Sequence, residues 1–415
     1  MRVELITIGD ELLLGFTVDT NSAFLGRELA ALGVEVPRRT TVGDDPGAIS
    51  AAVREALSRA DGVITTGGLG PTSDDVTMQA VAAALELDLE RNEGVVARLE
   101  EIWRSRGRPE PLPPANLSQA SLPRGATILT NHHGTAPGVF LERSDQRWVA
   151  VLPGVPREMR EMFTGGVRGL LASRSPGGQV VRSIAVRTTG VPESRLPALL
   201  DDYASGLDGL SLAYLPGVDG VDLRLTARGL TEPQADEKLR AAAQKLSERL
   251  KPYAYAEESV DLAEVVLEAC RRTGSRIAVA ESCTGGMLGQ RLTAVAGSSD
   301  VFAGGVIAYD DEVKIELLGV GRDALQRHGA VSEEVATAMA TEARRRFGVE
   351  IGVGITGIAG PGGGSAEKPV GTVWIAIAMP DEMVARRLRL FGDRHEVRHR
   401  SAQAALDLVR RSLAS

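Results

Sequence analysis

The stretch "RIAVAESCTGGMLGQRLTAV", residues 276–295, carries the pattern that decides the fold of its part of the chain. An apolar run suited to a buried β-strand is followed by a loop with two glycines and then by a segment with helical spacing. A strand that feeds a helix through a short loop is the repeating unit of a parallel sheet with crossover helices. Ligands bind such sheets beyond the carboxyl ends of the strands, so the loop at 281–286 is a candidate site.

The same alternation of short strands and longer helices extends through residues 259–415 and recurs through residues 1–165. Between them, residues 166–258 predict a strand (180–190), a helix (194–204), two strands (210–217 and 221–229) joined by the turn "PGVDG", and a helix (233–250). We therefore predict an α/β protein in which a small α+β domain joins two doubly wound α/β domains. A chain of 415 residues is long enough for two or three domains.

The overall composition and charge of the chain limit the classes of binding partner and the cellular compartments that we expect. A net charge of −8 without a basic stripe argues against direct nucleic-acid binding. Two cysteines without a CxxC pair indicate neither a disulfide framework nor a zinc site. The N-terminus lacks a signal-peptide pattern, and the apolar runs are too short to span a membrane. We expect a cytoplasmic protein without a membrane partner, and a homodimer.

The loop after the strand at 277–281 offers two nucleophiles, Ser282 and Cys283. A serine ahead of a helix is either a nucleophile or an N-cap, and its position leaves both open. The helix N-terminal amides are candidates for stabilising an oxyanion, and Gly285 and Gly286 let a substrate approach the backbone. The alternative for Cys283 is a small thiol buried under the loop, and we favour Ser282 because no histidine partner for a thiolate is evident.

A nucleophilic serine needs a base, and none of the five histidines follows a strand at an obvious place facing Ser282. The stretch "AYDDEVK" (308–314) instead supplies Tyr309 at a strand end and Lys314 one turn into the next helix. A neutral lysine accepts a hydroxyl proton, and the tyrosine hydroxyl would relay that proton or orient the lysine. The alternative is a surface lysine beside a half-buried tyrosine.

A cationic pair is predicted at the start of the last helix, in "GDRHEVRHR" (392–400). Asp393 and Glu396 have the spacing of a capping box, which defines where the helix begins. Arg394 and Arg398 then lie four residues apart on one helix face, where both can meet a phosphate. The alternative is a solvated basic helix start.

Six motifs occur in order between residues 280 and 398: "AESCTGG", "AYDDEVK", "HGAVSEEV", "GITGIAGPGGG", "KPVGTVWIA" and "GDRHEVR". Over residues 259–415 they resemble the nicotinamide-nucleotide amidase domain of the competence/damage-inducible protein A (CinA) family. The resemblance implies a serine nucleophile with tyrosine and lysine partners, matching Ser282, Tyr309 and Lys314, and a pocket position at Thr356. It implies hydrolysis of nicotinamide mononucleotide to nicotinic acid mononucleotide and ammonia without a cofactor. The predicted substrate contacts are Thr284, Gly285, Gly286, Gly357, Arg394 and Arg398.

In the first domain the stretch "VITTGGLGPTSDDVT" (63–77) follows a buried-looking strand and leads into a helix. Backbone amides around Gly67, Gly68 and Gly70 are candidates for cradling phosphate oxygens, although the stretch lacks the Gly-Lys-Ser/Thr ending of a P-loop. Asp74 and Asp75 are either helix caps or ligands of a divalent metal beside the phosphates.

This stretch, with "GDELLLG", "TVGDDPG", "GTAPG" and "LPGVPREM", resembles the molybdopterin-binding-like N-terminal domain of the same family, over residues 1–165. The resemblance implies action by two aspartates, Asp44 and Asp75, and metal-dependent cleavage of ADP-ribose to AMP and ribose 5-phosphate. The implied cofactor is a divalent metal ion, with potassium as a further candidate. Glu11 and Asn21 are candidate ribose contacts, and Arg157 is a candidate phosphate contact.

Three functions remain open on the sequence. The first is a bifunctional hydrolase with nicotinamide mononucleotide and ADP-ribose as its small-molecule partners. The second keeps the amidase but gives the N-terminal domain only the binding of a pterin or nucleotide. The third is a non-enzymatic scaffold in DNA uptake or repair, against which the acidic charge balance argues.

Overall fold

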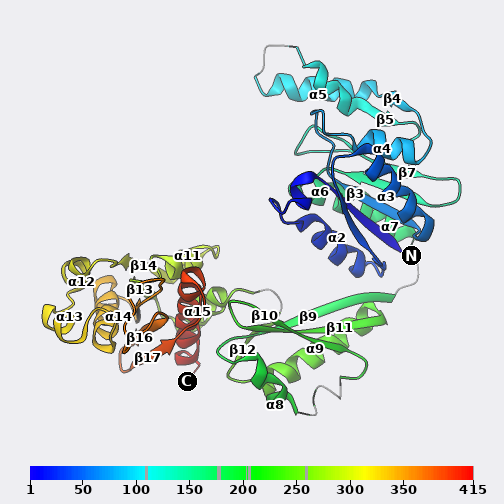
Figure 1. Ribbon diagram of the computed structural model, residues 1–415. Helices are drawn as coiled ribbons and strands as arrows, with labels where there is room; N and C mark the ends of the chain where they lie inside the picture. The colour runs from blue at the N-terminus through cyan, green and yellow to red at the C-terminus, as the bar shows by residue number, and fades with distance from the viewer. Residues whose placement is uncertain (108–110, 175–178, 202, 204–206, 258–259, 415) are drawn as a thin grey trace. The chain divides into compact units, whose positions relative to one another are not determined.

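The computed structural model describes residues 1–107, 111–174, 179–201, 203, 207–257 and 260–414 (Figure 1). The chain divides into two compact units, Met1–Arg182 with Ala227–Asp236, and Ser183–Thr226 with Glu237–Ser415. The predicted domain boundary at 258/259 lies outside the described residues, as does part of the helix predicted at 194–204. Within the described ranges, no helix has both the length and the apolar character needed to cross a membrane.

A mixed sheet in the order β2-β1-β3-β8-β7-β6 forms the centre of the first unit. Its parallel strands are β1 (Val3–Ile8), β2 (Arg39–Val42), β3 (Gly62–Thr66) and β8 (Trp148–Leu152). The antiparallel strands at one edge are β6 (Thr127–Leu129) and β7 (Gly138–Glu142). Every residue of β1, β3 and β8 is buried, as in a sheet covered by helices on both faces.

Helices cover both faces of this sheet, which confirms the predicted α/β class. One apolar core joins the sheet to α3 (Pro46–Arg59), α4 (Thr77–Ala84) and α5 (Glu93–Ser105). Another core joins it to α2 (Thr20–Ala31), α6 (Pro156–Met162) and α7 (Arg168–Arg174). The smaller elements are α1 (Asp10–Leu13), β4 (Leu89–Arg91) and β5 (Ser121–Pro123). Leu171 of α7 is fully buried in the second core, so this core continues past the predicted boundary at 165.

A smaller antiparallel sheet follows, in the order β10-β11-β9-β12. Its strands are β9 (Gln179–Thr188), β10 (Ser211–Pro216), β11 (Val221–Thr231) and β12 (Ala254–Glu257), accompanied by α8 (Leu196–Leu200) and α9 (Glu232–Arg249). The predicted order of strand, helix, strand, strand and helix is therefore confirmed. The prediction omits β12, whose four residues "AYAE" are too few to show strand periodicity.

The C-terminal part of the second unit is built on a sheet in the order β14-β13-β15-β16-β17. Its strands are β13 (Ile277–Glu281), β14 (Phe302–Ile307) and β15 (Ile351–Gly357), which are parallel, and β16 (Thr372–Ala378) and β17 (Met383–Arg389), which are antiparallel. The helices that share the larger core with this sheet are α10 (Leu262–Thr273), α11 (Met287–Thr293) and α15 (Arg394–Ser412). The helices that pack in a separate core with Ala280 of β13 are α12 (Asp311–Leu318), α13 (Arg322–His328) and α14 (Glu333–Phe347). This part is also α/β, with helices on both faces.

Candidate functional site

The parallel strands β13, β14 and β15 end at one edge of the C-terminal sheet, and the residues that follow them come together there. Glu281 of β13 pairs in register with Ile307 of β14 and with Ile355 of β15. The backbone N–H of Ser282 donates to the Ile355 carbonyl at 2.9 Å, one residue before Thr356. The structure therefore places the loop carrying Ser282, the strand end before Tyr309, and Thr356 at a common edge.

Ser282 lies in a tight turn before α11 and does not cap that helix. The N-cap is Gly286, at φ 92°, and it makes no side-chain capping hydrogen bond. The N-cap alternative for Ser282 is therefore wrong. Ser282 is 8% exposed, and its hydroxyl has no hydrogen-bond partner among the described residues. A partly accessible, unengaged hydroxyl is compatible with a nucleophile.

The carboxylate of Glu281 occupies the N-terminal amides of α11. It accepts hydrogen bonds from the N–H groups of Gly286 at 3.0 Å, Leu288 at 3.1 Å and Gly289 at 2.8 Å, and Glu281 is 1% exposed. These amides cannot also hold a substrate oxyanion, so the expected oxyanion site at the start of α11 is wrong. The sequence signal for Glu281 is a carboxylate at the end of a buried strand, directly before a glycine loop.

Lys314 is buried at 1% exposure, so the surface-lysine alternative is wrong. Its ammonium donates to the Tyr309 backbone carbonyl at 3.2 Å and pairs with the Asp311 carboxylate at 3.0 Å. The predicted contact between Lys314 and the Tyr309 phenol is not present. Tyr309 orients Lys314 through its main chain, and Asp311, three residues before Lys314, is a partner that the prediction omits.

The Tyr309 side chain is 58% exposed, and its hydroxyl accepts a hydrogen bond from Arg394 at 2.6 Å. Thr356 is buried, and its hydroxyl donates to the Ala330 carbonyl at 2.7 Å. The two side chains therefore differ in availability: Tyr309 lies open at the rim, and Thr356 is engaged by the backbone below it.

The cationic pair of α15 also meets this edge. The predicted capping box is confirmed, with the Asp393 carboxylate accepting from the Glu396 N–H at 2.9 Å and the Glu396 carboxylate accepting from the Asp393 N–H at 3.0 Å. Arg394 also donates to the Gly360 carbonyl at 2.6 Å, and Arg398 donates to the Thr284 carbonyl at 2.6 Å. The two arginines are thus tied to the site loops, and the alternative of a freely solvated helix start is wrong.

The remaining predicted substrate contacts of the amidase site differ in how deeply they are buried. The Thr284 hydroxyl is buried without a hydrogen-bond partner among the described residues, so it is available to a ligand that reaches it. At Gly357 an added Cβ would lie 2.7 Å from Val373 Cγ2 and 2.9 Å from the Thr372 carbonyl oxygen. Gly357 is therefore required by packing, whatever it contributes to binding. Gly285 lies at the loop surface, where an added Cβ would lie 3.4 Å from Arg398 Nη2.

Cys283 is a buried thiol, as expected from the prediction that Ser282 and not Cys283 is the nucleophile. It is 5% exposed within the apolar core, and burial raises its pKa to about 12. A thiol so rarely ionised at neutral pH is a poor nucleophile.

In the first unit, seven of the predicted residues line one cavity of about 230 Å³. They are Glu11, Asn21, Asp44, Gly67, Gly68, Asp74 and Asp75. Gly70 lies just behind it, since an added Cβ there would collide with the Asp75 carboxylate. Arg157 is exposed and is not among the lining residues, although the neighbouring Pro156 is. The structure therefore does not bring Arg157 into the cavity.

The carboxylates of this cavity are crowded. Asp44 accepts a hydrogen bond from the Asp10 N–H at 3.0 Å, and burial together with the charges of Asp10, Glu11 and Asp74 raises its pKa. Crowded carboxylates are the ligands that a hard divalent cation prefers. Within the described residues, however, no group of three or more acidic, histidine or cysteine side chains is already arranged to hold a metal ion. The donor chemistry fits a divalent cation, and a complete ligand cage is not preformed.

Asp74 and Asp75 do not cap α4. The N-cap residue of that helix is Val76, without a side-chain hydrogen bond, so the capping alternative is wrong. Asp75 accepts hydrogen bonds from both the N–H and the hydroxyl of Thr72. Both residues line the cavity, and the Asp75 carboxylate is engaged there by Thr72.

Asn21 gives this cavity a specific polar contact. Its side-chain nitrogen donates to the Gly154 carbonyl at 2.7 Å, which orients the amide. Its side-chain oxygen is buried without a partner among the described residues. An oriented, unsatisfied acceptor suits a ligand hydroxyl.

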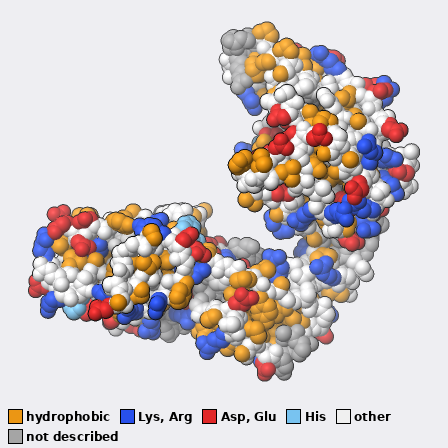
Figure 2. Space-filling model, in the orientation of Figure 1, with side chains coloured by type: hydrophobic (Ala, Val, Ile, Leu, Met, Phe, Trp, Pro, Cys, Tyr) orange, Lys and Arg blue, Asp and Glu red, His pale blue; other side chains and the backbone are white. Residues whose placement is uncertain are grey.

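Apolar side chains are exposed in the segment 13–18, next to this cavity. Figure 2 shows acidic and apolar side chains close together on the visible face of this unit.

Three family models match successive parts of the chain. The match for residues 4–173 is to a probable molybdopterin binding domain, that for 183–256 to the damage-inducible protein CinA KH domain, and that for 259–413 to the CinA C-terminal domain. These ranges follow the order of the domains described above.

Relatives match over the whole chain. A CinA-like protein of Gemmatimonas aurantiaca is 53% identical over 100% of this chain and 97% of its own length. A putative competence-damage inducible protein of Desulforudis audaxviator is 42% identical over 99% of this chain and 98% of its own. Among solved structures, CinA from Thermoplasma acidophilum is 35% identical over 41% of this chain and 99% of its own, with a TM-score of 0.38. By its sequence matches, which cover all parts of the molecule, this chain belongs to the CinA family.

Proposed function

We propose that the C-terminal domain hydrolyses the carboxamide of nicotinamide mononucleotide, giving nicotinic acid mononucleotide and ammonia. The observation that supports the proposal is that segments converging on one sheet edge carry a serine hydroxyl without a partner among the described residues, a buried lysine bound to the Tyr309 carbonyl, and two arginines bound to the site loops. The site thus offers a nucleophile, a proton acceptor and an anion-binding group to a single small molecule.

The chemistry follows from these groups. The Ser282 oxygen attacks the carboxamide carbon, and Lys314, once neutral, takes the hydroxyl proton. Collapse of the adduct breaks the C–N bond, and Lys314 returns a proton to the leaving ammonia. Water then hydrolyses the acyl-serine and regenerates the hydroxyl. Because the Asp311 carboxylate pairs with the ammonium form, Lys314 must release its proton before it can serve as a base.

The arginines of α15 account for selection of a nucleotide. Arg394 and Arg398 each direct one hydrogen bond to a site loop, and guanidinium groups have further N–H donors for phosphate oxygens. Tyr309, whose hydroxyl accepts a hydrogen bond from Arg394 at the open rim, would cover the nicotinamide ring in this proposal.

The test is ammonia release from nicotinamide mononucleotide by the purified full chain. Ser282→Ala should abolish release, and Ser299→Ala, at an exposed serine of the same domain, should not. Absence of ammonia with the wild-type protein, or undiminished release by Ser282→Ala, would refute the amidase proposal. Either result would favour the alternative of a non-enzymatic scaffold.

We further propose that the first unit cleaves ADP-ribose to AMP and ribose 5-phosphate. Asp75, Asp44 and Asp74 would hold a divalent cation, with potassium as a candidate second ion, and Asn21 and Glu11 would contact ribose hydroxyls. When bound, such a cation neutralises pyrophosphate charge and activates water. Burial, together with the neighbouring carboxylates, raises the pKa of Asp44, and a bound cation would stabilise its ionised form, which supports a requirement for a cation.

Asp75→Ala separates the two activities. It should abolish ADP-ribose cleavage and leave ammonia release intact, because Asp75 and Ser282 belong to different compact units. Loss of both activities would indicate misfolding. Tight binding of ADP-ribose without turnover by the metal-loaded wild type would instead favour a unit that only binds a nucleotide or pterin.

A further inference from the structure

A second cavity in the second unit lies apart from the residues assigned to the amidase. Its volume is about 740 Å³, within the range typical of small-molecule sites. One wall consists of the loops at 189–193 and 216–221 of the middle sheet, and the other of β17 and the C-terminal half of α15. None of the predicted amidase residues lines it.

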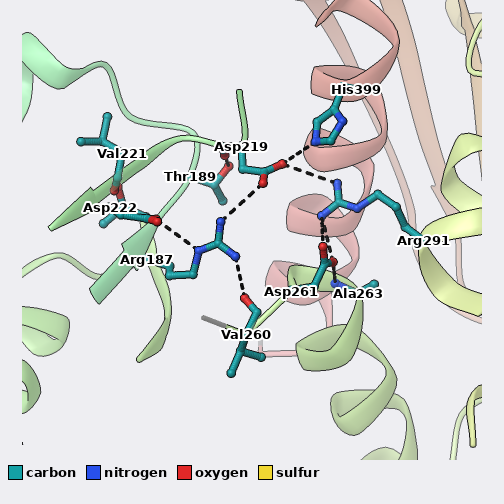
Figure 3. A network of polar contacts seen from close by, with 11 residues as sticks. Arg187, Thr189, Asp219, Val221, Asp222, Val260, Asp261, Ala263, Arg291 and His399 are labelled. Atoms are coloured by element: carbon teal, nitrogen blue, oxygen red, sulfur yellow. Dashed lines mark hydrogen bonds and ion pairs between the residues drawn. The ribbon is translucent and has the colours of Figure 1, made fainter. Parts of the chain in front are cut away.

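A polar network holds the loop at 216–221 in place (Figure 3). The Asp219 carboxylate lies 2.6 Å from His399 Nε2 of α15 and forms ion pairs with Arg187 at 3.4 Å and Arg291 at 3.9 Å. Arg291 also pairs with Asp261 at 2.9 Å, next to the start of α10. His399 of α15 is therefore a partner of the loop at 216–221 of the middle sheet. Because this network anchors the loop at 216–221, the wall that the loop forms is a defined surface of the cavity.

The wall formed by α15 contains an unsatisfied amide. Gln403 is 3% exposed, and neither its side-chain oxygen nor its nitrogen has a hydrogen-bond partner among the described residues. One turn further along, Asp407 is instead paired with Arg410 at 2.7 Å. A buried amide without partners is unfavourable, and a ligand that presents an acceptor beside a donor would satisfy both of its atoms. The edge of an adenine base has that arrangement, and glutamine pairs with it through two hydrogen bonds.

The rest of the cavity matches the other parts of an adenine nucleotide. Val191, Leu388 and Leu408 provide apolar lining against which a flat base can pack. Arg386 of β17 is exposed at the cavity, and its guanidinium makes no hydrogen bond or ion pair within the described part of the chain. An unengaged guanidinium at the mouth of an apolar cavity suits a phosphate group.

We propose that this cavity binds an adenine nucleotide, with the base on Gln403 and the phosphate on Arg386. The cavity shares α15 with the amidase site, since Arg394 and Arg398 begin the helix in which Gln403 lies. The proposal does not depend on either hydrolytic activity.

Calorimetric titration of the full chain with AMP, adenosine and ribose 5-phosphate tests it. AMP should bind more tightly than adenosine, which lacks the phosphate, or ribose 5-phosphate, which lacks the base. Gln403→Leu and Arg386→Ala should each weaken AMP binding at least about tenfold. Gln326→Leu, at an exposed glutamine of α13, is the matched control and should bind as the wild type does.

The first unit also has a proposed nucleotide site, so Asp75→Ala is titrated in parallel. Binding of AMP that survives in Asp75→Ala and is lost in Arg386→Ala supports the cavity. Binding that is lost in Asp75→Ala and unchanged in both Gln403→Leu and Arg386→Ala overturns the proposal. Arg386 is exposed, so its variant keeps the test decisive if Gln403→Leu fails to fold.

Discussion

Replacing Glu281 by glutamine should destabilise the turn that carries Ser282. The wild-type carboxylate accepts three hydrogen bonds from the start of α11, and it is almost completely buried. Glutamine retains one acceptor oxygen and turns an NH₂ group toward the remaining N–H groups. Hydrogen bonds to a charged acceptor contribute about 1.5–3 kcal/mol each and neutral ones about 0.5–1.5 kcal/mol, so the expected loss is about 3 kcal/mol.

Hydrogen exchange of the α11 amides measures this loss where it occurs. If these amides exchange through local opening, a loss of about 3 kcal/mol should accelerate the exchange of Leu288 and Gly289 roughly a hundredfold. Ammonia release should fall in parallel, because the turn holding Ser282 opens with the start of the helix. Glu316→Gln, at an exposed glutamate of α12, should change neither quantity. Exchange in Glu281→Gln within twofold of the wild type would refute the assignment of Glu281 as the anchor of this turn.

Three further perturbations have defined outcomes. Because burial raises the pKa of Cys283 to about 12, iodoacetamide at pH 8 should leave this thiol unmodified in the native chain and label it only in urea; rapid native labelling would contradict its burial. Burial and neighbouring carboxylates raise the pKa of Asp44, so its ionised form costs stability above that pKa. Asp44→Asn should therefore raise the Tm of the metal-free protein at pH 7, with a benefit that shrinks as the pH falls toward 3.8; an unchanged or lower Tm at pH 7 would count against it. Arg394→Met should raise the KM for nicotinamide mononucleotide about tenfold and leave that for nicotinamide riboside, which lacks the phosphate, unchanged; equal effects on both would exclude a phosphate contact.

Local patterns were sufficient for most of the secondary structure. The buried runs of β1, β3 and β13 are apolar enough to be recognised singly, and the capping box at Asp393 places the start of α15. Elements with little local signal were harder. β12 has only four residues and depends on its antiparallel partner β9.

The sequence was sufficient to predict which residues belong to the candidate site. It did not predict which of these residues contact one another. Ser282, Tyr309 and Lys314 follow strands that the alternation pattern identifies, so their meeting at one edge follows from parallel pairing. Which groups bond to one another depends on side-chain directions that spacing does not specify. Tyr309 thus meets Lys314 through its carbonyl and Arg394 through its hydroxyl.

The sequence by itself determined the α/β class, the order of the elements and the family, because these depend on periodicity and on motifs that are local in the chain. Only the tertiary structure decided how polar groups are satisfied. Glu281 takes the helix amides expected for an oxyanion, Asp219 joins His399 from 180 residues away, and Gln403 is buried without a partner. A buried polar group meets its partner through packing between segments that are distant in the sequence. The residues next to it in the sequence do not specify that partner.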